Sequence, residues 1–254
     1  MKKLIIILTF FLFLINNSSI AEPIGTVSKD YKVVTKDGFS IIANLEYPKI
    51  KDKKEFQTVV LLHSMGYSSQ WWETLPDELL GKGYAVLKID LRGHGKSVYN
   101  SKLVRISWKN LTNNAFKKYP SDIVSVIDYV KDENKRVFFN SWAIVGSDIG
   151  ANTAVLAANN IDNKPKTIVL LSPTIGSRGL YIPVKLAELS DVDFLSISGT
   201  DDKSGLGTQE YLEKFAQSTF ARYISESKST GMMLLKNDKS LSKFITVWIS
   251  DYLK

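Results

Sequence analysis

The pentapeptide GSDIG at positions 146–150 constrains the fold more than any other stretch, because it lies between two segments of different character. An apolar run, residues 142–145 (WAIV), precedes it, and a run of small residues, 151–158 (ANTAVLAA), follows it. This order predicts a buried strand that turns sharply into a helix. Glycines at the first and fifth positions allow the two backbones to approach closely, and Asp148 then stands on the turn at the positive end of the helix.

The rest of the chain predicts an α/β fold around this turn. Residues 31–47 alternate apolar and polar side chains on either side of an Asp-Gly pair at 37–38, which is typical of an antiparallel hairpin. After it, apolar runs and amphipathic segments alternate, which favours a mostly parallel sheet with helices on both faces and a ligand site at the carboxyl ends of the strands. The expected strands are 58–62, 84–89, 142–145, 167–171, 193–198 and 221–225, and the expected helices are 71–82, 121–131, 149–159, 208–217 and 240–253.

The N-terminus has the three parts of a secretory signal peptide. Lys2 and Lys3 precede an almost wholly apolar stretch, residues 4–15, and small residues stand at Ser19 and Ala21. We expect cleavage after Ala21, so that 1–21 is a signal peptide and 22–254 is a single exported domain, either periplasmic or extracellular. An uncleaved N-terminal anchor is the alternative.

Composition narrows the possible partners. The chain has no cysteine, so the exported protein can have neither disulfides nor a lipid-modified N-terminal cysteine. Its net charge is +7, but the lysines are scattered along the sequence and are interpreted as solvating the surface. We therefore expect no nucleic-acid partner and, once the signal is removed, no stable membrane anchor.

Two further motifs follow predicted strands. Residues 61–66 are LLHSMG and residues 90–97 are DLRGHGKS. Together with GSDIG, and in this order, they resemble the α/β hydrolase superfamily, in particular its lidless members of the serine-aminopeptidase and esterase type. The resemblance spans nearly the whole mature chain, and it implies an α/β hydrolase fold without a cap domain, since residues 172–191 are too few for one. A phosphate-binding loop at Gly95-Lys96-Ser97 is excluded, because its first glycine would fall at Asp90.

The resemblance makes GSDIG a nucleophile elbow and assigns roles around it. The nucleophile position, usually serine, is Asp148. The amide of Ile149 and that of Ser64 or Met65 would form the oxyanion hole. The acid position is Asp202, with Asp201 as the weaker candidate, and forming a turn after a strand is the alternative role for Asp202 as for Asp148.

The catalytic histidine that the resemblance leads us to expect is missing from this sequence. Its place, before a glycine and an apolar pair, is taken by Thr230. His63 and His94 are the only histidines, and both stand where the family has structural histidines; either of them acting as the base is the less favoured alternative. Ser147 stands one position too early on the elbow and is interpreted as an ordinary surface serine.

The remaining chemistry gives two hypotheses. An aspartate nucleophile, as in haloalkane dehalogenases and epoxide hydrolases of the superfamily, forms an ester that needs a histidine-activated water for release. We therefore favour a catalytically degenerate exported protein that binds a small molecule or acyl-type ligand, or acts as an accessory protein. The alternative is an active hydrolase of ester, amide or carbon–halogen bonds that uses Asp148 or an unrecognised base.

Two expectations concern charge and metal. If Asp202 lies more than about 6 Å away, we expect the helix dipole to outweigh its charge, which would leave Asp148 ionised at neutral pH with its side chain occupying the oxyanion donors. A metal site built from Asp148, Asp202 and His63 has no ligand-spacing motif, so no metal and no cofactor are expected.

Overall fold

A computed structural model describes residues 25–253 of the chain. The expected signal peptide and its cleavage site lie outside these residues, so the division at Ala21 stays a prediction. The main sheet of the described part has nine strands, and a separate hairpin forms a second, small sheet. The strands of the main sheet are β1 (Thr26–Val34), β2 (Phe39–Pro48), β3 (Phe56–Leu62), β4 (Ala85–Ile89), β5 (Tyr99–Asn100), β6 (Val137–Ser147), β7 (Thr167–Leu171), β10 (Asp193–Gly199) and β11 (Phe220–Ser225).

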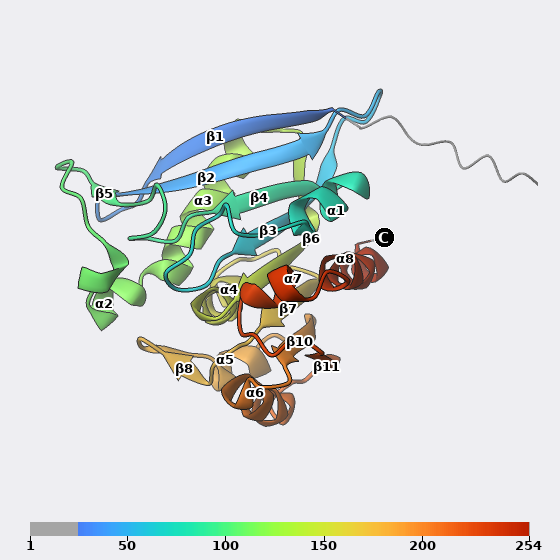
Figure 1. The fold of residues 1–254 in the computed structure, drawn as a ribbon. Coiled ribbons are helices and arrows are strands. Elements are labelled where there is room, and N and C mark those ends of the chain that lie inside the picture. The colour runs from blue at the N-terminus through green and yellow to red at the C-terminus, as the bar shows by residue number, and fades with distance from the viewer. Residues whose placement is uncertain (1–24, 254) are drawn as a thin grey trace, which may run out of the picture.

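The strands follow the order β1-β2-β4-β3-β6-β7-β10-β11, and the short β5 pairs with β2. β1 and β4 both run antiparallel to β2, and every pair from β4 through β3 to β11 is parallel. The predicted mostly parallel sheet opened by an antiparallel hairpin is therefore confirmed. Parallel neighbours in this order are connected by crossovers that contain helices. These helices lie on both faces of the sheet (Figure 1).

Helices cover both faces because each brings one apolar side to the sheet. The longer helices are α1 (Leu75–Gly81), α3 (Tyr119–Glu133), α4 (Ile149–Asn159), α6 (Lys203–Glu213) and α8 (Leu241–Tyr252), and the short ones are α2 (Asn113–Phe116), α5 (Pro183–Ala187), α7 (Met233–Asn237) and the 3-10 turn η1 (Trp108–Asn110). α3, α4 and α6 belong to one apolar core, while α1 and α8 belong to a second core on the opposite face. No helix within residues 25–253 has the length and apolar character needed to cross a bilayer.

Most boundaries agree with the sequence expectation, and two helices differ for local reasons. α1 begins at Leu75 instead of residue 71, because Pro76 fits the first turn of a helix and the residues before it form turns. α6 begins at Lys203 instead of residue 208, because the Asp202 side chain caps its first turn. Residues 172–192 form only the hairpin β8 (Gly176–Ser177) and β9 (Leu180–Tyr181) and the helix α5, so the described part has no cap domain.

Candidate functional site

The turn between β6 and α4 is as sharp as its sequence predicts. Asp148 adopts φ 51° and ψ −116°, a conformation that L-residues rarely occupy. Its amide donates a hydrogen bond of 2.8 Å to the carbonyl of Leu171 on β7, which holds the turn in place. Gly146 and Gly150 are required here, because a Cβ on the first would overlap the backbone of the second, and a Cβ on the second would overlap the carbonyl of Leu62. The elbow predicted from the sequence is thus present.

The side chain of Asp148 accepts a hydrogen bond from the loop after β3. The Met65 amide donates a 3.1 Å hydrogen bond to Asp148 Oδ2. Of the two amides proposed for that loop, it is therefore Met65 and not Ser64 that reaches the elbow residue. The expected contact between the aspartate side chain and an amide of this loop is present, and the role of that amide as an oxyanion donor stays a prediction.

The electrostatic environment of Asp148 differs from the expectation. Burial raises the pKa of this carboxyl, and the charge of Asp202 raises it further. The amides of Met65 and Ile149 lower the pKa, but they do not offset the loss of water. The net pKa shift is upward because of desolvation, whereas the amides at the turn affect the pKa more than the charge of Asp202 does, as expected. Ionisation of Asp148 at neutral pH stays a prediction.

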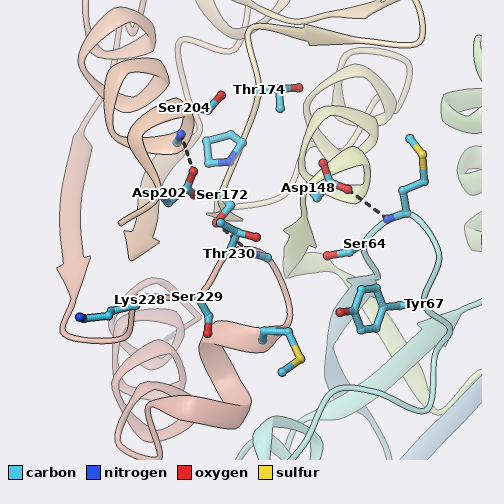
Figure 2. Close-up of a pocket in the computed structure, with 15 residues that line it drawn as sticks. Ser64, Tyr67, Asp148, Ser172, Thr174, Asp202, Ser204, Lys228, Ser229 and Thr230 are labelled. Carbon is cyan, nitrogen blue, oxygen red and sulfur yellow. Dashed lines mark hydrogen bonds between the residues drawn. The ribbon is translucent and has the colours of Figure 1, made fainter. Parts of the chain in front are cut away.

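A pocket of about 590 Å³ lies at the carboxyl ends of the strands, and it brings the three predicted positions together. Asp148, Asp202 and Thr230 all line it (Figure 2). Asp201 does not line the pocket and is exposed, which leaves Asp202 as the better placed acid. The other lining residues are Ser64, Met65, Tyr67, Ser172, Pro173, Thr174, Ser204, Gly205, Lys228, Ser229, Gly231 and Met233.

Asp202 is buried and only half of its carboxylate is satisfied. Oδ1 accepts a 2.8 Å hydrogen bond from the Gly205 amide, which is the cap that starts α6. Oδ2 is buried and has no hydrogen-bond partner among the described residues. An unpartnered buried carboxylate oxygen costs free energy, so this atom is available to a hydrogen-bond donor from outside the protein chain.

Thr230 stands on a loop whose backbone is tied to the floor of the pocket. The next amide, that of Gly231, donates to Ser172 Oγ at 2.8 Å, and the Met232 amide donates to Ser64 Oγ at 3.3 Å. Thr230 has no basic nitrogen. Lys228 is the only basic side chain that lines the pocket among the described residues, and Figure 2 shows it pointing away from Asp148. Sequence reasoning missed Lys228, since no motif includes it.

Ser147 is not a surface residue, contrary to the sequence interpretation. It is the last residue of β6 and is fully buried. Its Oγ lies 2.7 Å from Ser64 Oγ, beneath the floor of the pocket. The hydroxyl is committed to a structural hydrogen bond.

The two histidines are buried and structural, as expected. His63 Nε2 accepts from the Leu91 amide at 3.0 Å and Nδ1 donates to the Ser64 carbonyl at 2.8 Å. His94 Nε2 accepts from the Gly66 amide at 3.0 Å, which links the loop after β4 to the loop after β3. Burial lowers the pKa of His63 and lowers that of His94 to about 3, so both rings are neutral at pH 7.

No group of three or more metal-ligating side chains occurs in the described part of the chain. His63 in particular has both ring nitrogens within hydrogen-bond distance of backbone groups. It is therefore not available to join Asp148 and Asp202 around an ion.

Solved structures show the same fold at low sequence identity. An esterase from Pyrococcus furiosus is 15% identical with a TM-score of 0.67, covering 90% of this chain and 92% of its own. A dienelactone hydrolase from Anabaena variabilis is 16% identical with a TM-score of 0.64, covering 89% and 99%. A carboxyl esterase from Bacillus coagulans is 10% identical with a TM-score of 0.68, covering 90% and 99%. At these identities the likeness shows the fold alone.

The family assignment comes from the sequence. No curated protein matches the chain. The sequence pattern of the family described as serine aminopeptidase, S33 matches residues 53–198, which is more than half of the chain and includes the elbow and both preceding motifs. With the fold and the elbow described above, this protein belongs to the serine aminopeptidase S33 family of the α/β hydrolase superfamily.

Proposed function

We propose that this protein is an exported binding or accessory protein on an α/β hydrolase scaffold, and that it does not turn over a substrate. The observation that carries the proposal is the hydrogen bond from the Met65 amide to Asp148. An oxyanion hole works only if its donors are free to bind the charge that develops on the substrate. Here one donor is already bound to a carboxylate of the protein.

The absence of a placed base supports the same conclusion. General-base catalysis requires a basic atom within hydrogen-bond reach of the proton that it removes. Thr230 has no such atom, and His63 and His94 do not line the pocket and bond to backbone groups through their rings. The side chain of Lys228 points away from Asp148 (Figure 2). The described residues that line the pocket thus offer Asp148 no histidine for the release step.

The ligand proposed for this pocket is a small molecule. A volume of about 590 Å³ lies in the range that takes such ligands, and the lining combines hydroxyl groups, carboxylates and apolar side chains. Asp202 Oδ2, buried and unpartnered, favours a ligand that brings a hydrogen-bond donor to this end of the pocket. Export rests on the N-terminal sequence alone.

The second candidate is an active hydrolase, and one observation favours it. Asp148 occupies a strained backbone conformation at the pocket floor, which is the arrangement that presents a nucleophile to a substrate. Attack by its carboxylate would form an ester between Asp148 and the substrate carbon, with loss of the leaving group. Hydrolysis of that ester would require water activated by a base. The lining offers no histidine for this role, only the Asp202 carboxylate and Lys228, so we expect the protein to stop after one turnover.

Burst and steady-state assays distinguish the two. The exported protein is incubated with an activated aryl ester, an aryl amide, an epoxide and a haloalkane, each beside a no-enzyme control and the Asp148→Ala variant. The proposal expects no turnover above the control. A burst of one equivalent that Asp148→Ala abolishes would identify a stalled nucleophile, and steady turnover that Asp148→Ala abolishes would overturn the proposal.

A further inference from the structure

Residues 91–121 contain seven basic side chains and no acidic one. Three of the seven are neutralised by carboxylates from elsewhere: Arg92 by Asp37 and Asp122, Lys96 by Asp30, and Lys118 by Asp37. The other four form no ion pair with any residue in 25–253, and they are Lys102, Arg105, Lys109 and Lys117. After the ion pairs are taken into account, four positive charges on this segment remain uncompensated, so the net charge of the protein is unevenly distributed.

The same segment contains a hairpin whose tip exposes apolar side chains. Leu103 is 75% exposed, Val104 is 53% exposed and Tyr99 is 44% exposed. Figure 1 shows the hairpin around β5 projecting beyond the start of β2, on the same side of the molecule as α2. Single exposed apolar residues are common on protein surfaces, but three on one projecting hairpin form a patch that water solvates poorly. Lys102 and Arg105 flank the two most exposed of them.

The hairpin holds this tip in a fixed conformation. The side-chain oxygen of Asn100 accepts hydrogen bonds from the amides of Lys102 and Val104, both at 3.0 Å. The Ser101 amide donates to the Gly38 carbonyl, which joins the tip to the start of β2. Leu103 has φ 59°, a conformation that suits asparagine or glycine better than leucine. The hairpin thus bears a leucine at a position where a polar residue would be less strained.

We propose that the hairpin Tyr99–Ile106 is a reversible docking site for the surface of an anionic phospholipid bilayer. An interfacial segment of this kind places apolar side chains at the boundary between headgroups and acyl chains and leaves the flanking bases among the lipid phosphates. Leu103 and Val104 are the apolar side chains, and Lys102 and Arg105 are the bases beside them. A projecting tip with uncompensated positive charge fits a deformable anionic surface. This site is separate from the pocket at Asp148 and does not depend on the function proposed for that pocket.

Vesicle co-sedimentation tests the proposal. The exported protein, with its N-terminus determined by sequencing, is mixed with vesicles of equal parts phosphatidylglycerol and phosphatidylcholine, and with vesicles of phosphatidylcholine alone. We expect binding to the anionic vesicles only, and its loss as NaCl is raised from about 0.05 M to about 0.5 M. Lys102→Ala with Arg105→Ala should weaken binding about 25-fold, from roughly 5-fold per charge. Leu103→Asn should weaken binding while relieving the backbone, so unfolding cannot explain its effect.

Two control variants match these changes in kind. Lys51→Ala with Lys54→Ala removes the same net charge from the loop after β2, at the other end of that strand, and Val247→Ser removes a side chain that is 49% exposed on α8. Both controls should bind the vesicles as the unmodified protein does. Equal binding to neutral vesicles, no binding to anionic ones, or equal losses in the control and hairpin variants would overturn the proposal. Binding to a soluble anionic polymer without binding to vesicles would overturn it as well.

Discussion

The amide of Met65 donates a 3.1 Å hydrogen bond to the carboxylate of Asp148, and so joins the loop after β3 to the elbow after β6. Replacing the usual elbow serine with aspartate thus adds a longer side chain that reaches a donor which a substrate oxyanion would need. The bond also opposes the effect of burial on the carboxyl, because it stabilises the anion. Stability, pH response and activity are therefore linked through this one contact.

The first prediction is that Asp148→Asn stabilises the protein at neutral pH. An acid whose pKa is raised on folding binds more protons in the folded state, so its ionisation lowers stability as pH rises above the ordinary Asp value of about 3.9. Asparagine keeps an oxygen for the Met65 amide but carries no charge. We expect a gain of roughly 0.5–2 kcal/mol at pH 7, the range of typical stabilising substitutions, which disappears in acid.

Urea denaturation of both proteins between pH 3 and pH 8 measures this difference, and an NMR titration of Asp148 gives the pKa directly. A stability difference that grows in acid, or a titration below the ordinary aspartate range, would show that the amides outweigh burial.

The second prediction concerns a restored triad. Asp148→Ser alone should give no turnover, because the hydroxyl still lacks a base. The double variant Asp148→Ser with Thr230→His supplies both, and Asp202 Oδ2 is free to accept a proton of the new imidazole. Because triad residues act as a unit, we expect a gain of roughly 10²-fold or more over either single variant. The assay is hydrolysis of a short-chain aryl ester across pH 6 to 9. Equal activity in the single and double variants would show that residue 230 does not lie where the base is needed.

The third prediction tests the close approach at the elbow. Gly150→Ala should destabilise the protein by more than about 4 kcal/mol, because its Cβ would overlap the carbonyl of Leu62 and the backbone of β3 cannot move away. The matched control is Gly207→Ala in α6, where a Cβ meets nothing within 4 Å. This control should stabilise the protein by about 0.5–1 kcal/mol through helix propensity. Thermal unfolding measures both variants, and similar melting temperatures for the two would contradict the described packing.

The fourth prediction concerns the buried arginine. Arg92 forms two hydrogen bonds with Asp122, through Nε at 2.8 Å and through a terminal nitrogen at 2.7 Å, and both side chains are almost fully buried. Asp122→Ala should cost about 3–5 kcal/mol, because it removes one of the two carboxylates from a buried guanidinium. The exposed pair of Lys185 and Glu188 is the control, and Lys185→Ala should change the unfolding free energy by less than about 1 kcal/mol. Chemical denaturation decides, and equal small losses would show that Asp37 alone suffices.

The parts of the fold that were predicted correctly have sequence patterns that fit only one kind of secondary structure. β7 (Thr167–Leu171) and α4 (Ile149–Asn159) were predicted to the residue, because one is a continuous apolar run and the other a run of small residues after a turn. The short β8–β9 hairpin and α5 were not predicted, since a few residues carry no period. α6 begins earlier than expected because Asp202 was considered as an acid or a turn former, although an aspartate after a strand is also a good helix cap.

The positions of the candidate site were more predictable than its electrostatics. Asp148, Asp202 and Thr230 were placed together because each follows the carboxyl end of a predicted strand. The raised pKa of Asp148 was not predicted, because it depends on how deeply the side chain lies, and no sequence pattern reports that depth. Their functional roles, and the removal of a signal peptide, stay predictions.

The buried hydrogen bond between the hydroxyls of Ser64 and Ser147 determines how this protein should respond to reagents that label active serines. Reagents that mark active serines react with a hydroxyl that is both accessible and activated, and Ser147 is neither, since its oxygen lies 2.7 Å from a second hydroxyl in a fully covered position. A phosphonate probe should therefore leave this protein unmarked in a mixture where its catalytic relatives are labelled. The hydroxyl of Ser147 joins the elbow to the loop after β3 through a hydrogen bond. A survey that detects serine hydrolases by covalent labelling would therefore not detect this protein.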